Sequence, residues 1–289
     1  MRFLQPQTLE EALALKSQSP EAVPLAGGTD LMVDLNFDRR RPEAVMDLTQ
    51  IETLRQWHRD NGEFVIGPGM TYARLLTELG GELPGLAIAS RTVGSPQIRN
   101  RGTLGGNLGT ASAAGDALPP LVAAGAHIEV SSEHGSRTLS IEEFLVGAKR
   151  NALEPSELIT AIRVPVAHGP QQFSKIGTRN AMVIAVCSFA LNLNPQALKV
   201  GTGIGSAGPV TVRAAAAEGF LQDALEEGGL WESHAEIPDS ASARFSELVA
   251  EAASPIDDVR GTASYRRRAL TVMGRRTLNW AWGEYRGMK

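Results

Sequence analysis

Two glycine-rich segments in the first half of the chain have the residue types of a phosphate-binding site. The first, Gly27-Gly28-Thr29-Asp30, directly follows the apolar run 23–26. Because glycine lacks a Cβ atom, consecutive backbone N–H groups can turn toward one anion, and the anion can come close to the chain. The alternative interpretation is a tight strand-to-helix turn in which Thr29 or Asp30 caps the helix. Taken alone, this segment favours the turn.

The second segment, residues 102–116, combines paired glycines with hydroxyl, amide and carboxylate side chains. Three of its side chains can donate hydrogen bonds to phosphate or polyol oxygens: Thr103, Asn107 and Thr110. The amides of Gly105 and Gly106 can form a second anion cradle, and Asp116 can accept hydrogen bonds from sugar hydroxyls. The alternative is a polar surface loop without a ligand. Two such segments in one half of the chain predict a dinucleotide held from two sides.

A third glycine-rich segment, Gly203-Ile204-Gly205-Ser206-Ala207-Gly208, fits the G-x-G-x-x-G pattern but not the context in which that pattern binds nucleotides. Nucleotide binding requires a helix directly after the glycines, because the helix N-terminus binds the phosphates. Here Pro209-Val210-Thr211-Val212 follows instead. We therefore predict a turn between strands at this position.

No residue pattern indicates a nucleophile, a metal ion or an iron–sulfur cluster. Cys187 is the single cysteine and lies in an apolar run, so we expect a buried and inert thiol. A cluster held by four thiolates of this chain is impossible, and the five histidines have no metal-ligand spacing. Lys175 is either an ordinary surface lysine or one that reaches a cofactor. Redox chemistry would therefore require an organic cofactor.

The composition is that of an ordinary globular protein. The 289 residues include 28 Lys plus Arg and 32 Asp plus Glu, giving a net charge of −4, which argues against nucleic-acid binding. The arginines of 266–276 are therefore expected to form a solvated or subunit-facing surface. No apolar stretch reaches the roughly 18 residues of a membrane span, and the first residues do not resemble a signal peptide. The cytoplasm is the expected location.

Alternating helix and strand patterns indicate how these segments are positioned. Helices are expected to begin after Thr8, in a capping box with Glu11, after Thr71, and after Ser140. The pattern predicts further helices at 85–93, 117–124, 212–225, 241–253 and 263–285, and strands at 23–26, 44–48, 63–67, 127–131, 157–164, 173–176, 182–193 and 198–204. Periodicity disappears over 94–116, which we interpret as a long functional loop.

The first two glycine-rich segments together resemble the FAD-binding (medium) subunit of molybdenum hydroxylases, a family that includes carbon monoxide dehydrogenase and xanthine dehydrogenase. The resemblance is carried by Pro24-Leu25-Ala26-Gly27-Gly28-Thr29-Asp30-Leu31, by Ile98-Arg99-Asn100-Arg101-Gly102-Thr103-Leu104-Gly105-Gly106-Asn107 and by Gly115-Asp116. It continues through Pro155-x-Glu157-Leu158-Ile159, Lys175-Ile176, Pro209-x-x-x-Arg213 and Asp257-Asp258-x-Arg260-x-x-x-x-Tyr265-Arg266. Thr29 and Asp30 replace a His-Ser pair of the carbon monoxide dehydrogenases, which favours a different substrate.

The resemblance implies an α+β fold of the vanillyl-alcohol oxidase/PCMH type, with FAD-binding subdomains at 1–55 and 56–168 and a C-terminal domain at 169–289. That last domain should contain a three-stranded antiparallel sheet packed with helices. Two segments, Pro24 to Leu31 and Thr103 to Asn107, would wrap the FAD diphosphate. The residues assigned to FAD are Pro24, Leu25, Ala26, Gly27, Gly28, Thr29, Asp30, Leu31, Thr103, Leu104, Gly105, Gly106, Asn107, Thr110, Asp116, Ile159 and Lys175.

The implied function is electron transfer rather than activation of a substrate, so no catalytic residue and no metal ligand is expected in this chain. Partner subunits would carry the other centres: molybdopterin on a large subunit and two 2Fe–2S clusters on a small one, in a heterotrimer or a dimer of heterotrimers. Electrons would pass through FAD to NAD, oxygen or another acceptor. Two alternatives remain: a stand-alone flavin oxidoreductase and a nonenzymatic nucleotide-binding or assembly subunit.

Overall fold

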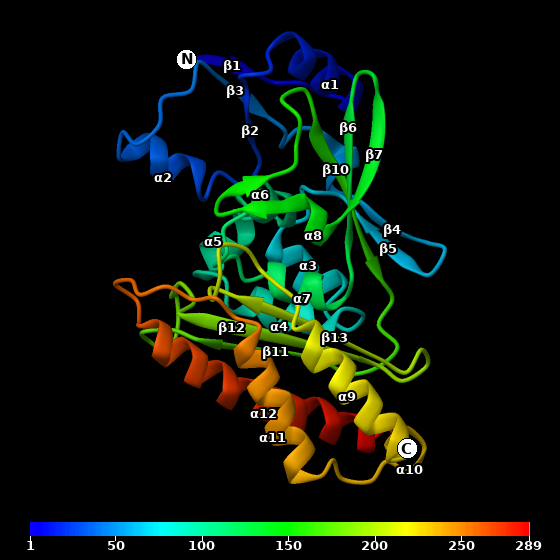
Figure 1. The fold of residues 1–289 in the computed structure, drawn as a ribbon. Coiled ribbons are helices and arrows are strands. Elements are labelled where there is room, and N and C mark those ends of the chain that lie inside the picture. The colour runs from blue at the N-terminus through cyan, green and yellow to red at the C-terminus, as the bar shows by residue number, and fades with distance from the viewer. Residues whose placement is uncertain (289) are drawn as a thin grey trace. The chain divides into compact units, whose positions relative to one another are not determined.

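The computed structural model describes residues 1–288, which form two compact units (Figure 1). Unit 1 comprises Met1–Glu78, Gly94–Ser112 and Ala126–Pro165. Unit 2 comprises Leu79–Val93, Ala113–Gly125 and the chain from Val166 onward. Both units are therefore discontinuous in sequence. The division into domains 1–55, 56–168 and 169–289 stays a prediction.

Unit 1 begins with a small parallel sheet in the order β1-β3-β2, built from β1 (Arg2–Leu4), β2 (Val23–Leu25) and β3 (Ala44–Asp47). Helix α1 (Leu9–Gln18) packs beside it, and Ala12 and Met46 are fully buried in their common core. The Thr8 hydroxyl caps α1 as predicted, accepting from the Glu11 N–H at 3.2 Å. The second half of the predicted capping box is wrong, because the Glu11 carboxylate accepts from the Gln7 N–H at 2.7 Å instead.

The second sheet of unit 1 is antiparallel, with strand order β4-β5-β10-β6-β7. Its strands are β4 (Trp57–Asp60), β5 (Glu63–Ile66), β6 (His127–Ser132), β7 (Gly135–Ser140) and β10 (Leu158–Pro165). On the central strand, Ile162 lies opposite Ile66 on one side and Ile128 on the other. All three side chains are fully buried, and such β-branched cross-strand pairs fix the register of a sheet.

Short elements connect these strands. They are α2 (Leu31–Asn36), the 3-10 helix η1 (Glu52–Arg55), α3 (Tyr72–Glu78), α5 (Pro96–Arg101), α6 (Leu104–Thr110), α8 (Ile141–Phe144), β8 (Leu145–Gly147) and β9 (Arg150–Asn151). The capping box of Ser140 and Glu143 is confirmed at the start of α8.

The prediction of an irregular loop over 94–116 is wrong, because α5 and α6 lie in it. Each helix has a hydroxyl cap at its start: Ser95 accepts from the Ile98 N–H at 3.4 Å, and Thr103 accepts from the Gly106 N–H at 3.0 Å. Three glycines in the seven residues of α6 conceal the helical pattern, since glycine is a poor helix former and contributes no apolar face.

Unit 2 contains a three-stranded antiparallel sheet, with β12 (Cys187–Asn194) between β11 (Gln171–Ile176) and β13 (Lys199–Gly205). Successive side chains of a strand point to opposite faces. Phe189 and Leu191 of β12 pack with α9 (Ala215–Glu227), α11 (Asp239–Glu251) and α12 (Ala263–Arg286). Helix α10 (Leu230–Ser233) follows α9 (Figure 1). Ala190 packs with α4 (Pro84–Arg91) and α7 (Leu118–Ala123) on the other face. The predicted three-stranded sheet packed with helices is confirmed.

Glycines of β13, including Gly203 of the third glycine-rich segment, have a packing role. A Cβ atom on Gly201 would lie 2.1 Å from the Ala123 carbonyl oxygen, and one on Gly203 would lie 2.0 Å from that of Pro119. The glycines therefore let α7 pack directly against the strand. The predicted turn is wrong for Gly203 to Gly205, which end the strand, and no helix follows until Ala215. The strand predicted at 182–193 begins only at Cys187.

Helix α12 is the last element of unit 2. Thr262 caps it by accepting from the Tyr265 N–H at 3.2 Å, and its buried side includes Leu270, Met273 and Leu278. Its exposed arginines break any apolar run. Within residues 1–288, no helix is long and apolar enough to span a membrane.

Candidate functional site

The first two glycine-rich segments meet in unit 1. A Cβ atom on Gly27 would lie 2.0 Å from the carbonyl oxygen of Arg101, so only glycine lets the two segments approach this closely. At the other end of the contact, the Thr110 hydroxyl donates to Asp30 Oδ2 at 3.3 Å. The structure therefore brings together the two segments that the sequence analysis assigned to one ligand.

The first segment forms an open cradle of backbone N–H groups. Among residues 1–288, no acceptor receives a hydrogen bond from the N–H groups of Gly27, Gly28, Thr29 or Asp30. Gly28 has φ +74°, a left-handed conformation that turns successive amides toward one side of the chain. Asp30 stands at the N-cap of α2 but makes no capping hydrogen bond with its side chain. These amides are therefore free to donate to an anion, and the side chain of Asp30 does not cap the turn.

The second segment does not form the predicted amide cradle. The Gly105 N–H donates to the Pro68 carbonyl at 2.9 Å, and the Gly106 N–H donates to the Thr103 hydroxyl at 3.0 Å. The Leu104 N–H donates to the Met70 carbonyl at 3.0 Å. The prediction of a second cradle at Gly105 and Gly106 is therefore wrong, because these amides hold α6 in place.

The glycines of α6 have two different roles. Gly105 is buried, and its Cβ atom would lie 2.3 Å from the Cβ atom of Pro68. Gly106 and Gly109 are exposed; a Cβ atom would meet only the Thr103 hydroxyl oxygen at 3.1 Å in the first case and nothing within 4 Å in the second. Glycine inside a helix costs about 0.5–1 kcal/mol relative to alanine. Packing does not require these two glycines. They are three residues apart and therefore lie on the same side of α6, where the absence of side chains lets a ligand approach the backbone closely.

Asn107 contributes a buried polar atom with no partner among the described residues. Its Oδ1 atom is inaccessible to solvent and accepts no hydrogen bond from residues 1–288. A buried carbonyl oxygen without a donor is unfavourable by about 1–3 kcal/mol. A hydroxyl or N–H donor of a bound group could satisfy it.

Asp116 and Lys175 form a buried ion pair in unit 2. Lys175 Nζ lies 2.6 Å from Asp116 Oδ2 and donates to the Thr92 carbonyl at 3.2 Å. The two side chains are 7% and 10% exposed, so Lys175 is not the ordinary surface lysine of the alternative interpretation. Burial raises the pKa of Asp116 above its ordinary value, and the Lys175 charge partly opposes this rise. Asp116 Oδ1 is buried, and a hydrogen bond from the Thr92 side chain to this carboxylate also opposes the rise of its pKa.

Ile159 lies on β10 of unit 1, opposite Val130 of β6, and is 8% exposed. The register of the β10–β6 pair shifts directly after it. A β-bulge of this kind redirects the neighbouring side chains.

Three residues that hold α6 were not found from the sequence. Pro68 and Met70 accept its first amides, and Asn151 Nδ2 donates to the carbonyl of Gly109 at 2.8 Å. The Pro68-Gly69 pair indicates a turn in the sequence, but not its partner on α6. Asn151 carries no local signal, because its contact is 42 residues away.

The single thiol of the chain lies outside these segments. Cys187 is fully buried at the start of β12, as predicted, and burial raises its pKa to about 12. It is therefore protonated at neutral pH and does not act as a nucleophile. No group of three or more His, Cys, Asp or Glu side chains suited to a metal ion occurs in residues 1–288.

An α+β chain with an open amide cradle beside bare glycine surface has the features of a protein that binds a phosphate-containing cofactor. Residues 1–167 match the profile of the family described as the FAD binding domain in molybdopterin dehydrogenase. The match covers more than half of the chain. The chain belongs to this family of oxidoreductase components, whose domain binds FAD.

Relatives and solved structures agree with this assignment. The chain is 34% identical over 193 residues to the nicotinate dehydrogenase FAD-subunit of Eubacterium barkeri, a match that covers 64% of this chain and 65% of that one. It is 30% identical to the 6-hydroxypseudooxynicotine dehydrogenase complex subunit alpha of Paenarthrobacter nicotinovorans, over 94% of this chain and 90% of that one. The fold is similar to a chain of carbon monoxide dehydrogenase from Hydrogenophaga pseudoflava lacking the Mo-pyranopterin moiety, with TM-score 0.87, 27% identity and 98% of each chain covered.

Proposed function

We propose that this chain is the FAD-binding electron-transfer subunit of a molybdopterin-dependent hydroxylase or dehydrogenase. In this proposal it takes electrons from the 2Fe–2S clusters of a partner subunit and passes them through FAD to NAD, oxygen or another acceptor. The observation that carries the proposal is the open amide cradle of Gly27 to Asp30, joined to the exposed glycine surface of α6. Membership of the FAD-binding family supports the choice of cofactor.

Each part of FAD is assigned to residues with suitable chemistry. The diphosphate is assigned to Pro24 to Leu31 and to Thr103 to Asn107. The free amides of the first segment donate to its oxygens, and the bare surface at Gly106 lets it approach. By resemblance, Thr110 and Asp116 bind the ribityl or ribose part, while Ile159 and Lys175 lie near the flavin.

When bound, FAD supplies the chemistry that no side chain of this protein provides, because it can accept and release electrons singly or in pairs. The task of the protein is then to bind, orient and shield the cofactor. The ion pair with Asp116 fixes the Lys175 side chain in a buried position. No residue of this chain needs to act as a general acid or base toward the organic substrate.

The finer architecture and the assembly also belong to the proposal. The FAD-binding part is assigned to the two-subdomain vanillyl-alcohol oxidase/PCMH type, with subdomains 1–55 and 56–168 and the C-terminal domain 169–289. The partners are a molybdopterin-binding large subunit and a 2Fe–2S small subunit, in a heterotrimer or a dimer of heterotrimers. Relatives named as a medium subunit and as a subunit of a dehydrogenase complex support this assembly. The proposed location is the cytoplasm, with export on the signal of a partner as an alternative.

The test begins with the absorbance spectrum of the purified chain, followed by acid release and chromatography of any chromophore. We expect the visible bands of oxidised flavin and FAD in the supernatant. A colourless protein that also takes up no added FAD would overturn the proposal. Turnover of an organic substrate by the purified chain without partner subunits would instead identify the alternative, a stand-alone flavin oxidoreductase.

A further inference from the structure

The C-terminal end of α6 is held by a distant segment, residues 149–157, which we call the strap. The Asn151 side chain donates from Nδ2 to the Gly109 carbonyl at 2.8 Å, and the Lys149 N–H donates to the Ala111 carbonyl at 3.1 Å. The last carbonyls of a helix have no partner within the helix. The strap therefore satisfies acceptors that α6 cannot satisfy itself.

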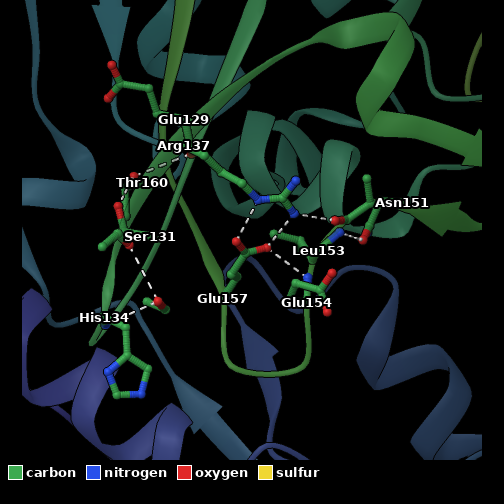
Figure 2. Close-up of polar contacts among 12 residues, drawn as sticks. Glu129, Ser131, His134, Arg137, Asn151, Leu153, Glu154, Glu157 and Thr160 are labelled. Carbon is green, nitrogen blue, oxygen red and sulfur yellow. Dashed lines mark hydrogen bonds and ion pairs between the residues drawn. The ribbon is translucent and has the colours of Figure 1, made fainter.

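The orientation of the Asn151 amide is fixed by its second contact. Its Oδ1 atom accepts from the Leu153 N–H at 3.2 Å, within the same strap (Figure 2). Because the oxygen faces Leu153, the nitrogen must face Gly109, where only a donor is useful. The side chain therefore connects the backbone of the strap to the backbone of α6 in one defined orientation.

The strap is itself anchored to the antiparallel sheet by one ion pair. Arg137 of β7 donates from Nε and Nη2 to the two carboxylate oxygens of Glu157, at 2.8 Å each, and from Nη2 to the Ala152 carbonyl at 2.8 Å (Figure 2). Glu157 also accepts from the Glu154 N–H at 2.8 Å, and its side chain is only 10% exposed. Such bidentate pairing restricts geometry more than a single contact does.

Helix α6 needs this external support. It has seven residues, too few for a helix that is stable alone, and the exposed glycines Gly106 and Gly109 weaken it further. Its first turn is held by Pro68, Met70 and the Thr103 cap. The contacts from the strap hold the opposite end, on which Gly109 lies.

We propose that Asn151 is a positioning residue for FAD, which fixes the α6 surface of Gly106 and Gly109 through the Gly109 carbonyl, and that the Arg137–Glu157 pair anchors it. The inference rests on the proposed function, because FAD is the ligand expected at α6. Without Asn151, the end of α6 is loose before binding, and FAD must order it. The apparent affinity for FAD then equals the intrinsic affinity multiplied by the fraction of molecules in which α6 is already ordered.

The experiment compares Asn151→Ala with the wild-type chain after removal of FAD. Titration with FAD should show two- to tenfold weaker binding, the range expected from the loss of one ordinary hydrogen bond. Backbone amides of α6 should exchange faster in the apoprotein of the variant, and saturating FAD should restore their protection. Ser131→Ala is the matched control. It removes the 3.0 Å contact between the Ser131 and Thr160 hydroxyls in the five-stranded sheet to which the strap is anchored, and it should change neither measurement.

A second variant separates the donor from the acceptor of Asn151. Asn151→Asp keeps an oxygen for the Leu153 N–H but loses the donor to Gly109. It should weaken FAD binding at both low and high salt, whereas simple repulsion between its new charge and the diphosphate would disappear at high salt. Arg137→Lys, which cannot form the bidentate pair, should produce the same α6 exchange effect in smaller degree.

The outcomes separate this inference from the proposed function. If the wild-type chain takes up no FAD, the proposed function fails. If the wild-type chain binds FAD and Asn151→Ala binds it equally well with unchanged α6 exchange, the inference alone is overturned. Loss of thermal stability without any change in FAD affinity would also overturn it, because a purely structural residue behaves in that way. Unchanged α6 exchange in Arg137→Lys would overturn the role of the anchor.

Discussion

Gly105 and Gly106 are adjacent in α6, yet substitution at each should affect a different property: stability at Gly105 and FAD binding at Gly106. We expect Gly106→Val to fold normally and to lose FAD, whereas Gly105→Ala should lose stability. The difference follows from what a side chain would meet. At Gly106 it meets only the Thr103 hydroxyl oxygen, at 3.1 Å, and otherwise solvent; at Gly105 it meets the Cβ atom of Pro68 at 2.3 Å.

The structure gives an expected size for each effect. Replacing an exposed helical glycine by valine gains about 0.3–0.5 kcal/mol of helix propensity, which a small shift of the Thr103 hydroxyl offsets, so the free energy of unfolding should change by less than about 0.5 kcal/mol. The valine side chain would occupy the space assigned to the diphosphate. Displacing the diphosphate would break at least one charge-assisted hydrogen bond to the amides of Gly27 to Asp30, and at about 1.5–3 kcal/mol for one such bond FAD binding should weaken roughly 10- to 150-fold.

For Gly105→Ala, the backbone of Pro68 must move. Overpacking costs about 1–3 kcal/mol, and loss of the hydrogen bond from the Gly105 N–H to the Pro68 carbonyl adds about 1 kcal/mol. At about 2–4 °C per kcal/mol for a chain of this size, the melting temperature of the apoprotein should fall by roughly 5–15 °C.

The assay pairs thermal unfolding of the apoprotein with FAD titration followed by flavin fluorescence. Gly283→Val is the matched control, because Gly283 is an exposed glycine of α12 with nothing within 4 Å of its Cβ position. It should alter neither quantity. Undiminished FAD affinity in Gly106→Val would refute the assignment of the diphosphate to this surface. Destabilisation of Gly106→Val to the level of Gly105→Ala would show that the fold, not the ligand, requires both glycines.

Three further predictions concern ionisable groups. Lys175→Met leaves the buried Asp116 carboxylate without its counter-charge, so urea unfolding should show a loss of about 3–5 kcal/mol. Because burial already raises the pKa of Asp116, the folded state favours the protonated acid, and the loss should be larger at neutral than at mildly acidic pH. The hydrogen bond from Arg137 lowers the pKa of Glu157 below its ordinary 4.5, so the stabilisation it provides is complete above that value and is lost as pH falls through the lowered pKa. Glu157→Gln should therefore unfold at lower temperature at neutral pH, and acid titration of its melting temperature should converge with that of the wild-type chain. Cys187, with a pKa raised to about 12, should resist thiol reagents in the folded protein and react on unfolding; rapid labelling of the folded chain would contradict its burial.

The elements that the sequence predicts well are those whose signals are local. The Thr8 and Ser140 caps, the strands β5, β6, β10, β11 and β13 and the long helix α12 follow from caps and apolar periodicity within a few residues. The edge strands β4 and β7 are not predicted. Helix α6 is missed for the same reason, because its stability comes from Pro68, Met70 and the strap rather than from its own residues. Tertiary contacts here override a poor helix propensity.

In the candidate site, too, local features can be predicted from the sequence and distant contacts cannot. That the two glycine-rich segments serve one ligand can be inferred from their composition, and the structure brings them together at Gly27 and Asp30. Which amides remain free cannot be inferred, because it depends on where the Gly105 N–H finds an acceptor. The pairing of Lys175 with Asp116 is likewise invisible in the sequence, since 59 residues separate them.

The contact between Gly27 and Arg101 also sets an order of events during synthesis. The two residues are 74 positions apart in the chain, so at about 5–20 residues per second the ribosome makes the first roughly 4–15 s before the second. The strap follows later still. A nascent chain that ends between these positions therefore carries only the first of the two glycine-rich segments. Lys175, the last residue assigned to FAD, is made after the strap, so binding that uses every assigned residue follows its synthesis.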